Sequence, residues 1–476
     1  MGEKQFGTIV KELWRSGPGK AGLILLGLLA VTSLIVIVAY PRDFGTAYWA
    51  NPAHWADNPK SAPPAWTNVF SGEKRPGHVI LDINGPSVSE STGRAYRRVY
   101  SKNTIIDSDS PPTFVSFSVS NVEYSQRPPV LTVVLLRPDG GEVTLARQVV
   151  SGPRSGESVP YTRYADEPLR ESVSADDRVL DSLVEIHGVD RTVVSSPLEA
   201  ALFGTYADGD GFQMLRGEYT LELTALFQTE EDSLESVRFV LGGSVYGVMG
   251  TDALGRDLAL GLLYGLPVAL LIGIATSTVS TILGMSLGMA SGYAGGWIDI
   301  LIQRAADIVA NIPVLPLLIF LVFIGGSKLW LILLVLVAFS WPGLTIMVRT
   351  MVLQLKTGLE VESAKALGSS NFRVVFRHIL PHAASYVLAQ LVFFAPSAIL
   401  AEAGLSFLGL GDPSIPTWGQ ILEYGFRTGA VFLGYWWWVV PPGLLIVLTA
   451  VTFMFLALGL EPVVDPRLRG RRSWHF

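Results

Sequence analysis

The sequence predicts an α-helical polytopic membrane protein with six transmembrane helices and a β-rich extracytoplasmic domain inserted between helices 1 and 2. Two observations carry this prediction. Six stretches are long and apolar enough to cross a bilayer, whose hydrocarbon core of ~30 Å takes about 20 residues of α-helix. Residues 41–250, between the first two stretches, are more charged and contain alternating segments typical of β-strands.

The composition excludes several classes of protein. The chain has 476 residues, of which 16% are charged and 49% are hydrophobic, whereas a soluble domain averages about 25% charged residues. It has no cysteine, which excludes a disulfide framework, a thiolate metal site and a cysteine nucleophile. The net charge of −6 argues against a nucleic-acid-binding protein, which would carry a basic excess.

None of the six predicted spans contains a charged residue. They are Ala21–Tyr40, Leu258–Trp297, Ile308–Ser327, Leu329–Val348, Ala383–Ala401 and Val439–Leu460. Asn311 and Pro313 interrupt the third of these spans, and a proline inside a helix is a common cause of a bend.

Lysine and arginine residues mark the side of the membrane that faces the cytoplasm, because cytoplasmic loops carry an excess of them. They concentrate before the first span, between the fourth and fifth spans, and after the sixth. Both termini are therefore expected in the cytoplasm, below a plasma or inner membrane, with residues 41–250 outside. That external region holds 18 basic and 28 acidic residues, a net charge of −10.

Several short strands are predicted in the external region. Val130–Leu136 and Glu142–Val150 flank a Pro-Asp-Gly turn, in which proline presets φ and glycine supplies a positive φ. Thr113–Tyr124, Tyr219–Leu226 and Val237–Val240 are further strand candidates. Short strands joined by such turns indicate a sandwich-like domain.

The loop between the fourth and fifth spans carries the most specific pattern in the chain. Leu359–Leu367 consists of good helix formers, with Glu360 and Glu362 in the first turn. Gly368 suits the left-handed position just past the end of a helix, and Ser370 or Asn371 can cap the helix that follows.

The second helix of this loop is predicted to be amphipathic. Phe372, Val375, Phe376 and Ile379 recur at helical spacing and form one apolar stripe, and Pro381 is expected to end the helix. A short amphipathic helix of this kind fits a groove on a partner protein or a resting place among lipid headgroups. The pattern alone leaves both readings open.

The same loop resembles the EAA loop of ABC importer permeases, which runs Glu-Ala-Ala, three residues, Gly, nine residues, Ile-x-Leu-Pro. Glu362, Ala364, Gly368, Leu380 and Pro381 match it in register. Ser363 replaces the middle alanine, and His378 stands at the isoleucine position with Ile379 beside it. Further segments resemble the C-type permease subunit of dipeptide/oligopeptide transporters: Gly250–Asp257, Phe376–Pro381, Leu405–Gly411 and Asp465–Arg469.

The resemblance implies a type I ABC importer-like fold for residues 1–40 with the first span, for a permease core 251–460 with a coupling loop at 357–382, and for a cytoplasmic tail 461–476. The external β-rich insert 41–250 departs from the family pattern, in which a short connection is usual at this place. The resemblance also implies contacts between the coupling loop and an ATPase subunit, made by Glu362, Ser363, Ala364, Gly368, Phe372, Phe376, Ile379, Leu380 and Pro381.

The partners implied are a second homologous permease, two ATP-binding subunits, an extracytoplasmic substrate-binding protein and membrane lipid. ATP and Mg are expected on the partner subunits, with no cofactor or metal in this chain. The chain itself has no Gly-x-x-x-x-Gly-Lys-Ser/Thr phosphate loop, so it is not expected to be an enzyme. His378 and His382 are four residues apart, but Pro381 between them argues against a metal-binding pair on one helix face.

Four residues are candidates for the translocation path: Glu402, Gln390, Asn311 and Pro313. A carboxylate at membrane depth is costly and therefore a functional candidate. Glu402 either lines the cavity, bonds across the permease pair, or is solvated where its helix ends.

The leading hypothesis is the permease subunit of an ATP-driven, binding-protein-dependent importer that forms a channel for short peptides. A second hypothesis keeps the machine and changes the cargo to oligosaccharides or a metal complex. A third is a membrane-anchored receptor or scaffold whose external β-domain does the work, against which the coupling-loop pattern argues.

Overall fold

The computed structural model describes residues 13–41, 43–93, 95–195, 197–207 and 211–464. The chain separates into two compact units. The membrane unit comprises Met1–Pro52 and Ala259–Phe476, and the β unit comprises Ala53–Leu258. The basic segments predicted near both termini, in 1–12 and 465–476, lie outside the described residues, as does the motif Asp465–Arg469.

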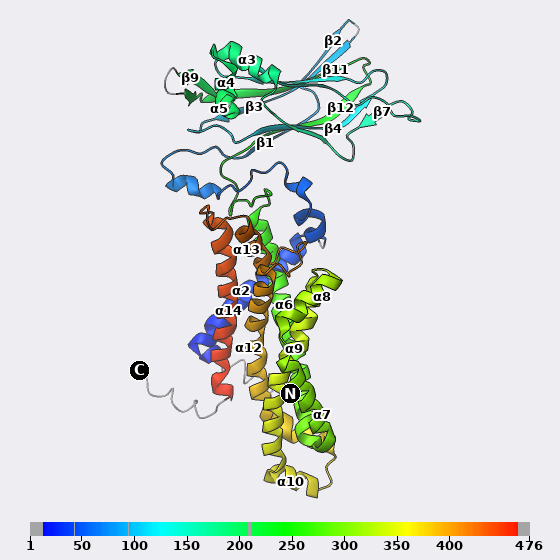
Figure 1. Ribbon diagram of the computed structural model, residues 1–476, viewed down its shortest axis with the longest axis vertical. Helices are drawn as coiled ribbons and strands as arrows, with labels where there is room; N and C mark the ends of the chain where they lie inside the picture. Colours follow the sequence, from blue (N-terminus) through cyan, green and yellow to red (C-terminus); the bar gives the residue numbers. More distant parts are fainter. Residues whose placement is uncertain (1–12, 42, 94, 196, 208–210, 465–476) are drawn as a thin grey trace. The chain divides into compact units, whose positions relative to one another are not determined.

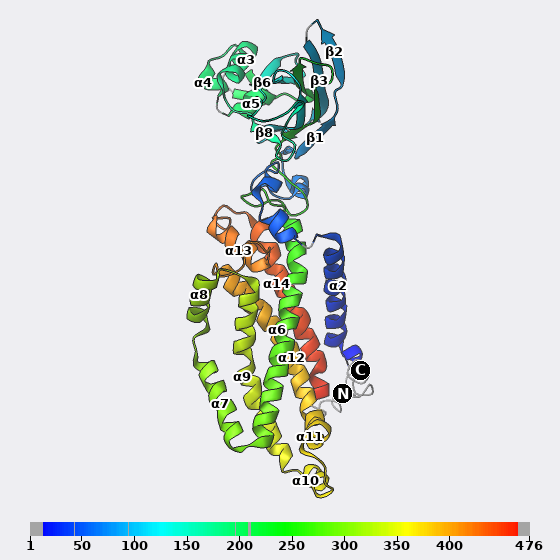
Figure 2. The same cartoon turned by 90° about the vertical axis from the view of Figure 1, so that its right-hand side faces the viewer.

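Long apolar helices form the membrane unit (Figures 1 and 2). They are α2 (Gly17–Ala39), α6 (Leu258–Ala294), α7 (Gly296–Asn311), α8 (Val314–Gly325), α9 (Leu329–Lys356), α12 (Leu380–Phe407) and α14 (Trp436–Val464), with shorter helices α10 (Leu359–Ala366), α11 (Asn371–Val374) and α13 (Trp418–Arg427). Among the described helices, five are long and apolar enough to cross a membrane, and α7 with α8 makes a sixth if the bent pair is one span.

The third predicted span is a broken helix. α7 and α8 meet at an angle of 80°. Ile312 is extended, with φ −75° and ψ 126°, because the proline that follows disfavours α-helical geometry at the preceding residue. At the end of α7, the side-chain amide of Asn311 donates to the carbonyl of Asp307 at 2.7 Å. α8 has 12 residues and, at 1.5 Å each, is too short to cross a bilayer alone.

Two antiparallel five-stranded sheets form the body of the β unit. One has the order β1-β12-β4-β7 with β8 also paired to β4, and the other has the order β2-β3-β11-β5-β6. The strands are β1 (Val79–Asn84), β2 (Val88–Thr92), β3 (Ala95–Ile106), β4 (Val115–Tyr124), β5 (Val130–Leu136), β6 (Glu142–Val149), β7 (Tyr161–Arg163), β8 (Leu169–Ser172), β11 (Gly217–Phe227) and β12 (Ser233–Leu241), with a separate hairpin of β9 (Gly204–Ala207) and β10 (Gly211–Met214).

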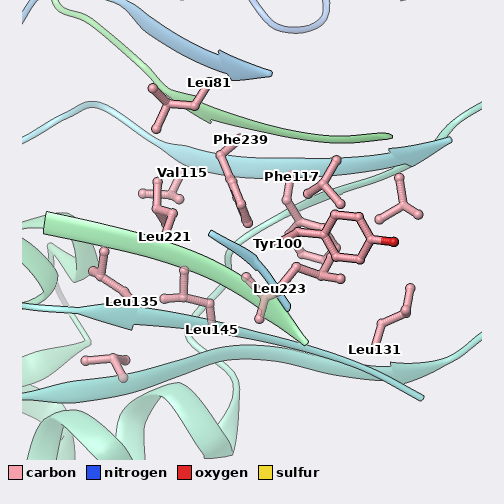
Figure 3. Packing of buried hydrophobic residues seen from close by; sticks show 14 of the residues in the cluster. Leu81, Tyr100, Val115, Phe117, Leu131, Leu135, Leu145, Leu221, Leu223 and Phe239 are labelled. Atoms are coloured by element: carbon pink, nitrogen blue, oxygen red, sulfur yellow. The ribbon is translucent and has the colours of Figure 1, made fainter. Parts of the chain in front are cut away.

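The hydrophobic core of the β unit lies between the two sheets (Figure 3). Phe117 and Phe239 project from one sheet, and Leu221 and Leu223 project from the other. Tyr100 is also fully buried there, and its hydroxyl donates to the carbonyl of Leu234 at 2.8 Å. Each large apolar side chain buried in this way contributes about 1.5–3 kcal/mol to the free energy of unfolding.

The sequence-based prediction of strands missed three helices, α3 (Asp177–His187), α4 (Arg191–Val194) and α5 (Leu198–Phe203). The signal for α3 is present in the sequence. The Asp176 side chain accepts hydrogen bonds from the backbone amides at its N-terminus, and Gly188 ends it with φ +66°. Val179 and Leu183, four residues apart, are its buried residues.

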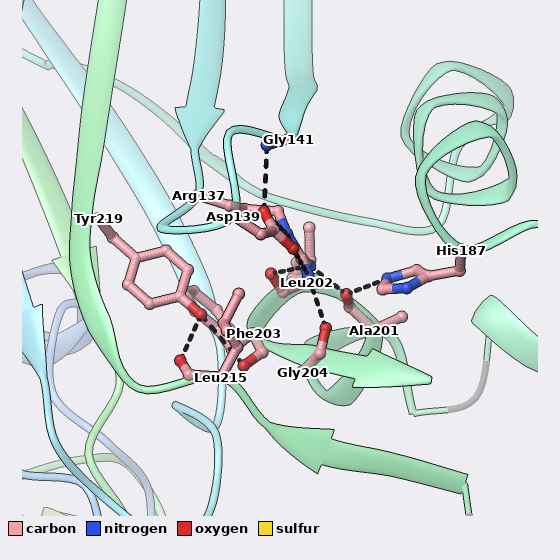
Figure 4. A network of polar contacts seen from close by, with 10 residues as sticks. All are labelled: Arg137, Asp139, Gly141, His187, Ala201, Leu202, Phe203, Gly204, Leu215 and Tyr219. Atoms are coloured by element: carbon pink, nitrogen blue, oxygen red, sulfur yellow. Dashed lines mark hydrogen bonds and ion pairs between the residues drawn. The ribbon is translucent and has the colours of Figure 1, made fainter. Parts of the chain in front are cut away.

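The predicted Pro-Asp-Gly hairpin turn holds a buried arginine (Figure 4). The Arg137 guanidinium has no exposed side-chain surface and bonds Asp139 at 2.8 Å. It also donates to the carbonyls of Ala201 and Leu202, each at 2.8 Å, and of Gly204 at 2.7 Å. These carbonyls lie at the C-terminal end of α5, where a cation is favourable. The hydrogen bond from Arg137 holds the pKa of Asp139 below its usual value.

Two segments at the base of the β unit are hydrogen-bonded together, and we call them the straps: residues 58–66 and residues 246–256. The Asn58 amide donates to the carbonyl of Gly255 at 2.9 Å, and the Trp66 indole donates to the carbonyl of Val248 at 2.9 Å. Between these contacts, the Thr251 hydroxyl donates to the carbonyl of Pro59 at 2.6 Å. The strap 246–256 contains most of the motif Gly250–Asp257 that the resemblance singles out.

Replacing Arg137 should destabilise the β unit. In Arg137→Met the carbonyls of Leu202 and Gly204 lose the guanidinium donor, whereas that of Ala201 keeps His187 and Asp139 keeps the Gly141 amide. Each buried group left unpaired costs about 1–3 kcal/mol. We expect the free energy of unfolding of the β unit to fall by about 3 kcal/mol or more, measured by pulse proteolysis of the full chain in urea. Arg127→Met, at an exposed arginine, is the matched control and should change little. Equal effects of the two variants would contradict the structural role of Arg137.

Candidate functional site

The candidate coupling loop is built from four helical pieces at one end of the membrane unit (Figures 1 and 2). α9 ends at Lys356, and Gly358 is the N-cap of α10. α11 follows, then the π-helical turn η4 (Val375–Ile379), which runs directly into α12. Glu360 and Glu362 lie in the first turn of α10, where acidic side chains favour the positive end of the helix dipole.

Gly368 ends α10 in the left-handed conformation, with φ +80°. Its amide donates to the carbonyl of Lys365 at 2.9 Å, and the amide of Ser369 donates to the carbonyl of Ala364 at 3.0 Å. This pair of hydrogen bonds is the Schellman motif. A Cβ built on Gly368 would meet no atom within 4 Å, so glycine is required here by backbone conformation and not by space.

The second helix of the loop does not end at Pro381, contrary to the prediction from the sequence. Ser370 caps α11 by accepting from the amide of Arg373 at 3.4 Å. The chain then remains helical through η4, and Pro381 lies in the first turn of α12. The missing amide of proline is tolerated there because the first amides of a helix have no intrahelical partner, and the π-turn shifts the preceding hydrogen bonds.

The predicted apolar stripe is split between two faces. Of the stripe, Ile379 is buried and Val375 is partly buried, next to Val374 and to Val361 and Ala364 of α10, in a cluster that includes residues of α6, α9 and α12. Phe372 and Phe376 instead remain 72% and 52% exposed, with ring centroids 4.3 Å apart. The π-turn and the capped start of α11 change the phase of the helix, which a constant spacing of 3.6 residues cannot represent.

The remaining predicted coupling residues also divide. Glu362, Ser363 and Gly368 are exposed on the outside of the loop. Leu380 and Pro381 are partly buried and line, with Phe376, a small apolar pocket of about 180 Å³. The loop therefore has a buried face that holds it to the bundle and an exposed face with two aromatic rings.

Tyr293, at the end of α6, connects the loop to the bundle and was missed in the sequence. Its hydroxyl donates to the Asn371 side chain at 2.8 Å, and its carbonyl accepts from Lys356 Nζ at 2.6 Å. The ammonium group of Lys365 lies 5.4 Å from the centre of the ring, within the range of a cation–π contact. One tyrosine thus contacts residues of α9, α10 and α11, and no local pattern marks it.

Glu360 bridges two histidines, one in η4 and one at the start of α12. Its carboxylate oxygens lie 2.9 Å from His378 Nδ1 and 3.2 Å from His382 Nε2. The expectation that Pro381 breaks the helix between the two histidines is therefore wrong, because the chain stays helical from η4 into α12. Its hydrogen bonds hold the pKa of Glu360 below its usual value, and the bond with His378 has a larger effect than the bond with His382.

A bidentate ion pair joins α7 to α9. Arg349 Nε and Nη2 each lie 2.6 Å from an oxygen of Asp299. The Ser291 hydroxyl also donates to Asp299, and Gln303 donates to Ser291 at 3.0 Å. Paired planar groups of this kind fix orientation as well as distance.

Glu402 is enclosed within the chain and is only 3% exposed. Ser406 donates to it at 2.6 Å, and Thr417, the N-cap of α13, makes a further side-chain hydrogen bond to it. The reading that Glu402 is solvated at a helix end is wrong, because α12 continues to Phe407. Gln390 is partly buried in α12, whereas Asn311 and Pro313 are exposed at the bend between α7 and α8. Among the described residues, no hydrogen bond or ion pair joins one of the four candidates to another, and their role in translocation stays a prediction.

Residues 280–470 match the family described as binding-protein-dependent transport system inner membrane component. The dipeptide transport system permease protein of Bacillus subtilis (strain 168) is 34% identical over 221 residues, which cover 46% of this chain and 68% of that protein. The chain belongs to this family of ABC importer permeases. The glutathione transport system permease protein of Shigella flexneri serotype 5b is 36% identical over 230 residues, covering 48% of this chain and 75% of that protein.

A chain of a solved structure, the MetNI methionine ABC transporter in an inward-facing conformation, is similar to the permease with a TM-score of 0.36 and 19% sequence identity. The match covers 44% of the permease and 98% of the chain in that structure. The permease is a multi-pass membrane component of a binding-protein-dependent importer. Its relatives are transport subunits and not enzymes.

Replacing Gly368 tests the helix stop. Gly368→Val should strain the left-handed backbone by about 1–2 kcal/mol and lower the stimulation of ATP hydrolysis by loaded binding protein, while the permease still inserts. Gly368→Asn is the matched variant, because asparagine tolerates this conformation and nothing lies near the new Cβ. The measurement is the ratio of stimulated to basal ATPase activity in the reconstituted importer. The interpretation fails if Val and Asn have the same effect.

Proposed function

We propose that the permease forms the channel for short peptides, with a second homologous permease, two ATP-binding subunits and an extracytoplasmic binding protein as its partners. The observation that carries the choice of cargo is the naming of the relatives, which are dipeptide, peptide and glutathione permeases at 33–36% identity. Oligosaccharides and metal complexes are the competing cargoes. We further infer six spans of the type I importer kind, with α7 and α8 as one bent span.

The coupling loop is proposed to dock on an ATP-binding subunit through its exposed face. Phe372 and Phe376, together with the exposed Leu359 and Leu367, present apolar surface at the end of the bundle, and aromatic side chains dominate the energy of such contacts. The buried face ties the loop to α6, α9 and α12. Motion of the ATP-binding subunit would therefore reach these spans. The loop and both termini would lie in the cytoplasm, as the lysine and arginine distribution indicates.

The β unit is proposed to contact the binding protein at the outer mouth of the channel. It is joined to α6, whose far end carries the coupling loop's anchor Tyr293, and so it belongs on the opposite side of the membrane. Residues 41–250 carry a net charge of −10, from 18 basic and 28 acidic residues. Such a charge attracts a basic surface over a distance limited to about 8–10 Å at physiological salt.

Deleting both sheets between two paired strand residues tests this role. Val79 and Leu241 are cross-strand partners at the base of β1 and β12, where opposite Cα atoms lie about 4.5–5.5 Å apart. Replacing Val79–Leu241 by a few Gly and Ser residues removes both sheets and keeps the straps. We expect correct insertion and basal ATPase activity, with weaker docking of the binding protein and reduced transport. The measurements are the dissociation constant of the complex at low and high salt, and uptake into proteoliposomes.

A larger deletion of Asn51–Leu241 is the comparison, because it also removes the strap 58–66 that holds Gly250–Asp257. It should additionally lower the thermal stability of the permease. Unchanged docking and full transport in the smaller deletion would show that the β unit is a dispensable cap.

Cargo can be tested on the binding protein proposed as a partner of the permease. A panel of di-, tri- and tetrapeptides should bind, and matched oligosaccharides and metal–chelator complexes should not. Binding measured by calorimetry, followed by uptake of the tightest ligand through the reconstituted importer, is the readout. Tight binding of a sugar or metal complex with no peptide binding would transfer the proposal to that cargo.

A further inference from the structure

Two of the three residues in the Glu360 bridge lie outside the family pattern that identifies the coupling loop, and the third, His378, stands where the pattern has isoleucine. Glu360 precedes the matched position Glu362 by two residues, and His382 follows the matched position Pro381 by one. The bridge nevertheless spans the whole loop, because its partners are separated from Glu360 by 18 and 22 residues. It joins the first turn of α10 to the turn η4 and to the start of α12.

We propose that Glu360 is a positioning residue that, through His378 and His382, clamps α10 to η4 and α12, so that the coupling loop moves as one body when an ATP-binding subunit moves. The proposal rests on the coupling role assigned to this loop. It adds a specific mechanical connection between the exposed first helix and the transmembrane helix α12.

The need for a clamp follows from how little else holds α10 in place. α10 has eight residues, and an isolated helix of that length is unstable in water. Only Val361 and Ala364 of α10 are buried in the cluster beneath it. Between α10 and α11 the chain turns at Gly368, which has nothing packed against it within 4 Å of a Cβ position. Lys365, in the last turn of α10, contacts the Tyr293 ring, and the contacts of Glu360 add a second attachment at the first turn of the helix.

The charges around Glu360 are accounted for within the described part of the chain. His378 and His382 are the groups that act on its carboxylate. On the neighbouring elements, Lys356 and Lys365 face Tyr293, and Arg349 of α9 pairs with Asp299. Arg373 and Arg377, on α11 and η4, form no ion pair among the described residues. Glu362 is exposed on the same helix.

The first experiment measures the ratio of stimulated to basal ATPase activity of the complete reconstituted importer. We expect Glu360→Gln to lower this ratio roughly two- to fivefold, the order expected for the loss of one exposed polar side-chain contact. His382→Gln should behave alike, and the double variant should be no worse than either single variant. Independent, multiplying effects would overturn the proposal.

The second experiment uses the absence of cysteine from this chain. In Glu360→Cys with His382→Cys, a short bifunctional thiol reagent should crosslink the two thiols within one chain, detected by mass spectrometry of the permease. The uncrosslinked variant should couple poorly, and the crosslinked one should regain coupling, because a covalent tie replaces the clamp. Loss of residual coupling on crosslinking would mean that α10 must separate from α12 during the cycle and would overturn the proposal. If neither the Glu360 variants nor Gly368→Val change the ATPase ratio, the coupling role of the loop fails. If Gly368→Val lowers the ratio and the Glu360 variants do not, only the clamp fails.

Discussion

The bilayer contains no water to satisfy backbone amides and carbonyls, and the architecture of the permease depends on this constraint. It favours long helices in the hydrocarbon and irregular backbone at their ends. The helix ends at Gly368 and Gly409 follow that rule. Gly368 and Gly409 both have φ +80° and end helices with the same pair of hydrogen bonds, so the carbonyls that the helix leaves free are paired before the chain turns.

The coupling loop has one face buried against the transmembrane helices and one face exposed. Its inner residues Val361, Val374 and Ile379 are buried against helices that must themselves be stable in lipid. Its outer aromatic residues Phe372 and Phe376 remain exposed, while Tyr293 and Glu360 bond residues of the loop. In the proposed mechanism, these contacts let a short helix at the end of a bundle transmit force without a hydrophobic core of its own.

Much of the membrane unit can be predicted from sequence because a span of about 20 apolar residues is a strong and local signal. The helix stop at Gly368 and the cap at Ser370 are equally local, and both are present. The continuation of the helix through Pro381 was not predictable, because it depends on the π-turn η4 and on the packing of Ile379 beneath it. The strands around the Pro-Asp-Gly turn were recognisable, whereas Tyr293 and the histidine bridge bring together residues far apart in the chain.

The adjacency of the two straps has an evolutionary consequence. Domains whose chain ends lie close together can be inserted into a loop, or lost from it, with little disturbance of the host. Asn58 and Gly255 are 197 residues apart in the chain and are joined by one hydrogen bond. The sheets could therefore have been acquired in a single genetic event by a smaller ancestor with a short outer loop, and selection could afterwards have modified them independently of the transmembrane helices.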